Sequence, residues 1–291
     1  MHRILSKWRT VMVRIITDSA ADFEPAELER LNIVCIPLTV QIGEEAYQEN
    51  INLSKEKFYT LLEQTKEFPK TSQAPIQTVL DIYEDAKKAG DDAVHITISS
   101  AISGTYQTAL AIRDMAEYDR CHVVDSLNAT GGQRMLVEYA VKLRDEGKSA
   151  AEIAYAVEAM RGRIILFACM DTLEYLYLGG RISRTVYTLG SMAQIKPIIR
   201  VAEDGSIEVP AKAMGMRKGL DILCKKIAAN PPSPDFPIYA MYTGNREGGV
   251  KMAERIRAMG YDVPDERIIN VGAAIGSHVG PNALGFVYIK E

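Results

Sequence analysis

The chain has 291 residues, of which 47% are hydrophobic and 25% are charged, and its formal net charge is -4. This length favours two domains with sizeable cores, and the acidic balance argues against nucleic acid as a partner, because phosphate binding needs clustered Lys and Arg. The longest continuous apolar run, residues 164–170 (IILFACM), is well short of the roughly 20 residues that cross a bilayer.

Residues 1–11 (MHRILSKWRTV) are basic and partly apolar, but they lack the apolar core of a secretion signal. We predict a short tail there, and a membrane-touching amphipathic segment is the alternative. The four cysteines lie far apart in apolar stretches, which is typical of reduced core thiols in a cytoplasmic protein. The cysteines and the four histidines do not have the spacing of metal ligands, so no metal is predicted.

From residue 12 onward, apolar runs alternate with amphipathic segments. The runs predicted to be strands are 13–17, 33–43, 93–98 and 121–125. The segments predicted to be helices are 24–32, 54–64, the part of 70–90 that follows a hydroxyl-bearing turn, 104–118 and 131–147. Strand–helix alternation of this kind predicts a parallel sheet with helices on its faces. Residues 12–150 are therefore predicted to form a Rossmann-like α/β domain.

The pattern changes after about residue 149. Helices are predicted at 149–163, at 172–183 with its last turn on two glycines, and from about 247 to 259. Strands are predicted at 164–170, 236–244, 266–272 and 285–291, together with a hairpin over 196–214 that turns at Asp204 and Gly205. These segments predict a smaller C-terminal α/β domain over 151–291 that contains an antiparallel pair. The fold class is thus α/β with two domains that meet near residue 150.

Hydroxyl-bearing turns follow several of the predicted strands. They are residues 17–22 (TDSAAD), 70–75 (KTSQAP), 97–107 (TISSAISGTYQ) and 124–132 (VDSLNATGG). Ligands of open parallel sheets bind outside the carboxyl ends of the strands, where such turns meet. A single turn of this kind is more often a helix cap, but the five hydroxyls of 97–107 exceed what one helix start uses. With Gly104 allowing close backbone approach, this turn resembles an anion site.

The sequence also limits which anion such a site would bind. The glycine fingerprints of dinucleotide and P-loop sites are absent, and so is the nucleophile elbow of α/β hydrolases. A single carboxylate remains the favoured anion. His278 lies in a stretch, 272–285, that we predict to be a loop because it is too glycine-rich for a helix; it is either a donor or base that crosses a domain interface or a surface histidine. Arg181 follows two glycines and is either a C-cap cation or a charge aimed at the cleft.

Seven motifs in this order resemble those of the DegV family of bacterial fatty-acid-binding proteins. They are IITDSAAD, KTSQAP, SSAISGTYQTA, VVDSLNATGGQ, LGGRIS, IKPII and GSHVGPNALG, and the similarity runs from Met12 to the end of the chain. The resemblance implies two α/β domains that hold a long-chain fatty acid such as palmitate between them, with no cofactor. It implies that Thr71 and Ser103 bind the carboxylate, with His278 near the head group. The other site residues that we carry over from these motifs are Ser72, Gly104, Thr105 and Arg181.

The resemblance further implies a lipid-binding protein of the cytoplasm rather than an enzyme. Such a protein would collect a fatty acid during transient membrane contact and present the carboxylate to a soluble partner, for which a fatty-acid kinase is the candidate. Kinase-serving members tend to carry arginines in the run after the hairpin, where this chain has Met214 and Met216. This departure argues against the kinase partner more than against lipid binding.

Two other classes of function remain open at this stage. A serine hydrolase would use Ser103 as nucleophile and His278 as base, with Asp18 or Asp125 orienting the base, since a triad is defined by geometry and not by order. A small-anion sensor would share the hydroxyl turns but would need no long apolar cavity.

Overall fold

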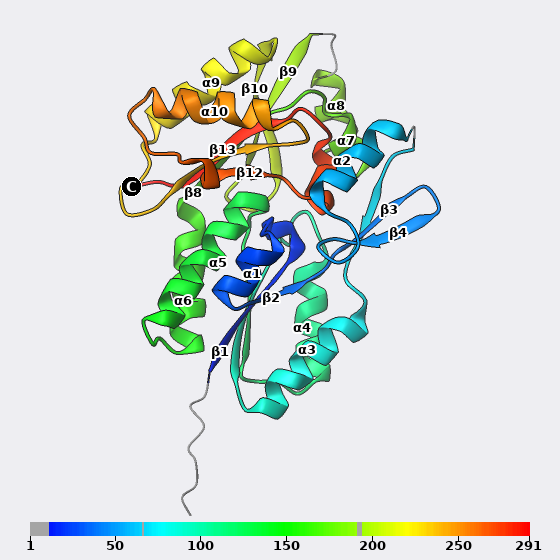
Figure 1. Ribbon diagram of the computed structural model, residues 1–291, viewed down its shortest axis with the longest axis vertical. Helices are drawn as coiled ribbons and strands as arrows, with labels where there is room; N and C mark the ends of the chain where they lie inside the picture. The colour runs from blue at the N-terminus through cyan, green and yellow to red at the C-terminus, as the bar shows by residue number, and fades with distance from the viewer. Residues whose placement is uncertain (1–11, 66, 191–193) are drawn as a thin grey trace, which may run out of the picture.

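The structure is a computed structural model that describes residues 12–65, 67–190 and 194–291, so the tail predicted at 1–11 lies outside the described residues. Two α/β units lie one above the other along the long axis of the molecule (Figure 1). One contains a four-stranded sheet and the other a six-stranded sheet, and a small three-stranded sheet lies beside them. The predicted α/β fold class with two units is confirmed.

The four-stranded sheet is parallel throughout, with the strand order β2-β1-β6-β7. Its strands are β1 (Val13–Asp18), β2 (Ile33–Ile36), β6 (Asp92–Thr97) and β7 (Cys121–Asp125). Neighbouring side chains of a strand point to opposite faces, so Ile15 packs with α1, α5 and α6, whereas Ile16 packs with α3 and α4. These helices are α1 (Pro25–Leu31), α3 (Ile76–Ala89), α4 (Thr105–Met115), α5 (Thr130–Asp145) and α6 (Ala150–Met160).

Helix α6 packs on the four-stranded sheet although nearly all of it lies beyond residue 150. Its buried side chains Ile153 and Val157 join the same core as Val94 of β6 and Leu136 of α5. The division at 150/151 stays a prediction, and this packing favours a division after Met160, the last residue of α6.

The six-stranded sheet is mixed, with the order β10-β9-β8-β13-β11-β12, and only β11 and β12 pair in parallel. Its strands are β8 (Ile164–Cys169), β9 (Ile195–Val201), β10 (Ile207–Met214), β11 (Ile238–Tyr242), β12 (Ile268–Asn270) and β13 (Leu284–Ile289). The predicted hairpin is the antiparallel pair β9–β10. Helices α9 (Met216–Ala229) and α10 (Arg246–Arg257) cover one face. The other face packs on α5, which joins the two units.

Short elements complete both units. They are α7 (Glu174–Leu178), α8 (Arg184–Gly190) and the 3-10 turns η1 (Ser19–Ala21), η2 (Arg161–Arg163) and η3 (Asp265–Arg267). Helix α7 ends at Leu178, and its C-cap is Gly179, the first glycine of the pair at which the sequence placed the end of a helix.

The single strand predicted over 33–43 is wrong, because the segment forms two strands in different sheets. Strand β2 ends at Ile36, and β3 (Thr39–Ile42) begins after Pro37, which has no backbone N–H to donate to a ladder. Strand β3 pairs antiparallel with β4 (Glu45–Gln48) and β5 (Lys70–Ser72). The first half of the predicted turn 70–75 is therefore an edge strand, and helix α2 (Lys55–Gln64) lies between β4 and β5 in the chain.

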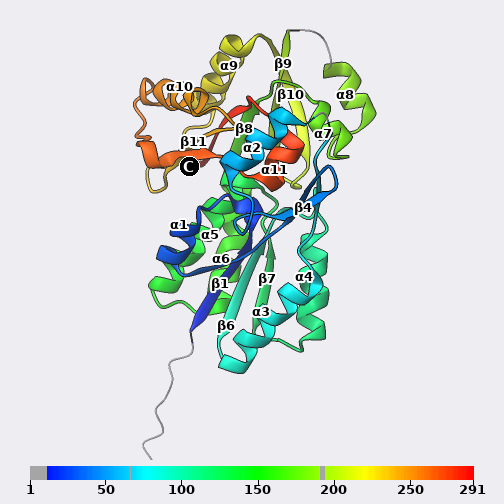
Figure 2. The same ribbon diagram turned by 45° about the vertical axis from the view of Figure 1, so that its right-hand side comes forward.

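The loop predicted for the first half of 272–285 is also wrong, because Ala273–Val279 forms helix α11. Gly276 suits this helix because a Cβ there would lie 2.7 Å from both Phe58 and Tyr59 of α2. The close packing of α11 on α2, visible in Figure 2, outweighs the roughly 1 kcal/mol that a helical glycine costs. Helix α11 therefore depends on contacts with a segment more than 200 residues away in the chain, as the Tyr59–Val271 hydrogen bond with its separation of 212 illustrates.

Candidate functional site

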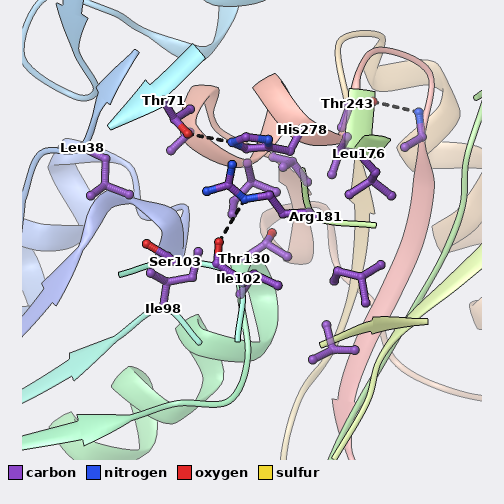
Figure 3. A pocket seen from close by; sticks show the side chains of 18 of the residues that line it. Leu38, Thr71, Ile98, Ile102, Ser103, Thr130, Leu176, Arg181, Thr243 and His278 are labelled. Atoms are coloured by element: carbon purple, nitrogen blue, oxygen red, sulfur yellow. Dashed lines mark hydrogen bonds between the residues drawn. The ribbon is translucent and has the colours of Figure 1, made fainter. Parts of the chain in front are cut away.

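A cavity of about 610 Å³ lies between the two units. One wall comes from the carboxyl-end loops of the parallel sheet, and the other comes from the face of the six-stranded sheet that is turned toward them (Figure 3). Its apolar lining includes Leu38, Ile98, Ile102, Leu166, Ala168, Leu176, Ile199, Val201, Ile207, Ile275, Val279 and Leu284. The cavity thus occupies the position at which open parallel sheets bind ligands.

Four of the polar residues singled out in the sequence line this cavity together. They are Thr71 from β5, Ser103 from the loop after β6, Arg181 from the loop after α7 and His278 from α11. Figure 3 shows their side chains facing a common space, with the apolar side chains extending away from it. Ser72 and Gly104 also line the cavity, and both are exposed. Segments from both units therefore build one polar end of a largely apolar hollow.

Thr71 and His278 form a direct pair across the interface. The Oγ1 atom of Thr71 lies 2.7 Å from Nε2 of His278, and the two residues are 207 positions apart in the chain. Burial, with a smaller effect from the Arg181 charge, lowers the pKa of His278 to about 3. The imidazole is therefore neutral at physiological pH and carries a single ring proton.

The other ring nitrogen, Nδ1 of His278, is buried and has no hydrogen-bond partner within the described part of the chain. It packs against Gly179, where a Cβ atom would lie only 2.1 Å away. We assign the ring proton to Nε2, because this tautomer leaves no buried N–H group of the ring without an acceptor. Nε2 then donates to Thr71 Oγ1, which leaves the Thr71 hydroxyl proton free for a ligand.

Ser103 sits where the loop after β6 meets the loop after β5. Its Oγ atom lies 2.8 Å from Oγ1 of Thr105 and accepts a 3.3 Å hydrogen bond from the Thr105 backbone N–H. The two loops are in contact at Gly104, because a Cβ there would lie 2.3 Å from Nε2 of Gln73. Thr105 itself is buried and does not line the cavity, so it orients Ser103 and does not face the hollow.

Arg181 brings a positive charge to this end of the cavity. Its Nε donates to the Ile102 carbonyl at 3.0 Å, and its Nη1 donates to the Gly179 carbonyl at 2.6 Å. It therefore caps the end of α7 and bridges the two units at the same time. Burial lowers the pKa of Arg181 from its usual range, but a guanidinium stays protonated. No ion pair joins Arg181 to a carboxylate of residues 12–65, 67–190 or 194–291, so its charge favours an anion in the cavity.

Two buried carboxylates that the sequence analysis missed hold the start of α11. Asp22 accepts a hydrogen bond from Gly272 N at 2.9 Å, and Glu49 accepts from the backbone N–H groups of Ala273 and Ala274. Burial raises the pKa of Asp22 to about 6 and that of Glu49 to about 7. These acids fix the helix that carries His278.

The neighbours of these two acids complete a buried polar cluster. Thr130 donates to Asp22, and Lys55 donates to the Asp22 carbonyl at 2.8 Å and pairs with Glu24. The only signal in the sequence is a glutamate in the otherwise apolar and amide-rich run 47–53 (YQENINL). Such a signal does not indicate which helix the carboxylate holds.

The serine-hydrolase interpretation finds no support in the described residues. Ser103 hydrogen-bonds Thr105, and His278 hydrogen-bonds Thr71, so the proposed nucleophile and base are not paired. Asp18 accepts from the backbone N–H of Ala20 and Ile98, and Asp125 accepts from backbone N–H groups of its own loop and of Ser100. Neither carboxylate orients the imidazole, which a triad requires.

No group of three or more His, Cys, Asp or Glu residues is arranged to hold a metal among the described residues. None of the helices described there is long and apolar enough to cross a bilayer. The four cysteines are free thiols.

Comparison with known proteins gives one family. A model of the DegV family, described as a family of uncharacterised proteins, matches residues 12–291. A DegV domain-containing protein of Caldanaerobacter subterraneus is 33% identical over 284 residues, which cover 96% of this chain and 99% of the relative.

Solved structures agree with the sequence match. A fatty-acid-binding DegV family protein of Thermus thermophilus superposes with a TM-score of 0.87 at 26% identity, covering 97% of this chain and 100% of that one. DegV of Bacillus subtilis, described as a fatty acid binding protein, superposes with a TM-score of 0.80 at 28% identity, with the same coverage of both chains. Because the family match spans every residue from Met12 to Glu291 and the relatives match over nearly their whole lengths, this chain belongs to the DegV family.

Proposed function

We propose that the protein binds one long-chain fatty acid in the cavity between its two units, with the carboxylate at the end formed by Thr71, Ser103, Arg181 and His278. The observation that carries this proposal is the gathering of hydroxyls, a neutral imidazole and an unneutralised guanidinium at one end of a largely apolar cavity. The Thermus and Bacillus relatives, which are described as binding fatty acids, support it. A sensor of small anions would need no apolar extension, so this lining favours a lipid.

The chemistry of the polar end suits a carboxylate. With Nε2 of His278 donating to Thr71 Oγ1, the Thr71 hydroxyl donates to one carboxylate oxygen, and the Ser103 hydroxyl donates to the same group. Hydrogen bonds to a charged partner contribute about 1.5–3 kcal/mol each. Arg181 adds attraction without a competing ion pair in the described chain.

Burial of the acyl chain dominates the affinity. A palmitate chain has about 14 methylenes, and burying each contributes about 0.8 kcal/mol, or on the order of 11 kcal/mol before the costs of ordering the ligand. This exceeds the contribution of the hydroxyls. The polar end therefore sets the orientation of the ligand, and the apolar lining sets most of the binding strength.

The protein is proposed to act as a carrier in the cytoplasm and not as an enzyme. Ser72 and Gly104, which line the polar end, are exposed, so the carboxylate lies near the surface while the chain is shielded inside. This arrangement suits collection of a fatty acid at a membrane and presentation of its carboxylate to a soluble enzyme, such as a fatty-acid kinase. Met214, at the end of β10, is 56% exposed, so a kinase partner would meet an apolar side chain there.

Mass spectrometry of the purified protein tests the proposed function. The protein is purified without detergent, extracted with organic solvent and analysed for lipids. We expect long-chain fatty acids in near-stoichiometric amounts. An extract without fatty acid, from protein that also takes up none when palmitate is added, would contradict the proposal.

The same preparation distinguishes a carrier from a hydrolase. Incubation with p-nitrophenyl esters and a fluorophosphonate is expected to give neither turnover nor labelling, because Ser103 has no paired base. Turnover with labelling of Ser103 would favour the enzyme instead.

A further inference from the structure

The six-stranded sheet forms one wall of the cavity between the two units, and a row of residues crosses this wall from strand to strand. Ala168 of β8 is paired with Ile199 of β9 on one side and with Gly285 of β13 on the other. Gly285 is paired in turn with Met241 of β11. All four residues line the cavity. The two smallest, Ala168 and Gly285, therefore lie side by side in the middle of the row.

The alternation of side chains along β8 shows which face of the sheet Ala168 belongs to. Neighbouring side chains of a strand point to opposite faces, and Phe167 and Cys169, which flank Ala168, belong to the core that α9 and α10 cover. Ala168 belongs instead to a cluster with Leu176 and Ile199, both of which line the cavity. The methyl group of Ala168 therefore lies on the cavity face of the sheet.

Strand packing explains the small size of Gly285 but not that of Ala168. A Cβ atom at Gly285 would lie 2.6 Å from the carbonyl oxygen of Phe167 and 3.0 Å from the Cβ of Ala168, so the close approach of β13 to β8 requires glycine. Position 168 faces a cavity of about 610 Å³, so a larger side chain fits there without moving the strands. Alanine at this position leaves a depression in the cavity wall.

Helix α11 shows how the cavity extends from its polar end. His278 lies near the last residue of this helix, Val279. At the other end of the helix, the N–H of Val271 donates to the carbonyl of Tyr242 at 2.8 Å, which places the start of α11 beside Met241. The helix rises about 8 Å between its first residue and His278. Met241 therefore lies in a part of the cavity that is remote from the polar end.

We propose that Ala168 determines the length of acyl chain that the protein accepts, because its small side chain leaves the depression along which the chain passes toward Met241. This inference rests on the proposed function and adds a determinant of ligand size to it. A larger side chain at position 168 fills the depression and stops the chain before it reaches the remote part of the cavity. A shorter acid, held at the polar end, keeps its affinity.

Two substitutions of different size fill the depression to different extents. Each methylene that loses its buried place lowers the affinity about fourfold, so displacing two methylenes lowers it about 16-fold. Ala168→Leu is therefore expected to shift the preference from long acids to short ones. Ala168→Val adds less volume and is expected to give a smaller shift in the same direction. Its β-branched side chain suits a strand, so this variant decides the question if leucine prevents folding.

A second change at the neighbouring strand is expected to reverse the effect. Ile199 lies opposite Ala168 in an antiparallel pair, in which facing Cβ atoms are about 5 Å apart. Ile199→Ala therefore returns the space that Ala168→Leu removes. Ile198→Ala is the matched control, because it truncates the same residue type in the same strand but on the face that α9 and α10 cover. Ala46→Leu adds the same side chain at an exposed position of β4.

The experiment measures competition between decanoic and palmitic acids for each purified variant, with the bound acids quantified by mass spectrometry and folding checked by circular dichroism. For Ala168→Leu we expect the ratio of bound palmitic to bound decanoic acid to fall by about tenfold or more below wild type. Adding Ile199→Ala is expected to restore most of the ratio, and adding Ile198→Ala is expected to leave it low. Ala46→Leu is expected to keep the wild-type ratio.

The outcomes distinguish the two proposals. Wild-type protein that binds palmitic acid, together with unchanged ratios in Ala168→Leu and Ala168→Val, overturns the role of Ala168 and leaves the fatty-acid carrier standing. Equal recovery with Ile198→Ala and Ile199→Ala, or an equal fall in Ala46→Leu, overturns that role as well. Wild-type protein that binds neither acid overturns the proposed function and the role of Ala168 together.

Discussion

Replacing Thr71 with valine is expected to weaken binding of palmitate by about 10- to 100-fold, because one hydrogen bond to a charged group is lost, worth about 1.5–3 kcal/mol. Valine keeps the shape of the side chain and removes only the hydroxyl that contacts Nε2 of His278. Hexadecanol has the same chain but a neutral head group, so its binding is expected to weaken only about two- to tenfold. Titration of each variant with both ligands measures the difference.

The controls for this prediction lie inside and outside the cavity. Ser103→Ala is expected to discriminate between the acid and the alcohol in the same direction as Thr71→Val. Thr60→Val changes an exposed threonine of α2 whose hydroxyl donates to the Glu56 carbonyl, and it is expected to leave both affinities unchanged. If Thr71→Val weakened the binding of palmitate and hexadecanol equally, the carboxylate would not be bound at this end of the cavity.

Replacing Glu49 with alanine is expected to lower the free energy of unfolding by about 2–4 kcal/mol. The substitution leaves the buried N–H groups of Ala273 and Ala274 without acceptors, and each unsatisfied buried group costs about 1–3 kcal/mol. Because these groups begin the helix that carries His278, fatty-acid binding is expected to weaken in the same variant. Urea unfolding followed by circular dichroism measures the first effect.

The conservative variant Glu49→Gln isolates the effect of the carboxyl's ionisation on the free energy of unfolding. Burial, reinforced by the nearby Asp22 carboxylate and opposed by Lys55, raises the pKa of Glu49 from 4.5 to about 7 in the folded protein. Between these values the folded state holds a proton that the unfolded state has lost, so this residue makes stability fall as the pH rises from about 4.5 to 7. The contribution is on the order of 3 kcal/mol.

Unfolding free energies at pH 5 and pH 8 test this linkage. Glu49→Gln has no titrating group at the site, so it is expected to lose less stability than wild type over this interval. Glu63→Gln, on the exposed side of α2, is expected to follow wild type. If the unfolding free energies of wild type and Glu49→Gln changed equally between pH 5 and pH 8, the Glu49 carboxyl would not titrate in this range.

The parallel sheet was predictable because its signals are local. Three of its four strands are apolar runs of about the right length, and β2 is the first part of the longer run 33–43. The helices have their own amphipathic periods and caps, such as Gly90 at the end of α3. The antiparallel hairpin around Gly205 was predictable for the same reason. No long-range contact had to be known to place these elements.

Helix α11 and the three-stranded sheet could not be predicted because they depend on distant partners. The glycines of 272–285 locally favour a loop, and the helix forms because Asp22, Glu49 and Tyr59, all more than 200 residues away, hold its first turn. Strand β5 has three residues and a largely exposed pattern, and it exists because β3 pairs with it. Pattern analysis does not detect interactions of this kind.

The candidate site likewise has features that the sequence predicts and features that it does not. The convergence of Thr71, Ser103, Arg181 and His278 on one cavity follows from strand–turn order together with motif similarity, whereas their role in binding stays a prediction. The pairing of Thr71 with His278, and of Ser103 with Thr105, required coordinates.

A crystal structure of the protein loaded with ω-bromopalmitic acid tests the central claim most directly, because anomalous scattering from bromine locates the far end of the chain. We expect the carboxylate oxygens within hydrogen-bond distance of Thr71 Oγ1 and Ser103 Oγ, and the bromine among the apolar side chains of the cavity. Bromine beside Thr71 and His278, or a ligand bound outside the cavity, would contradict the account.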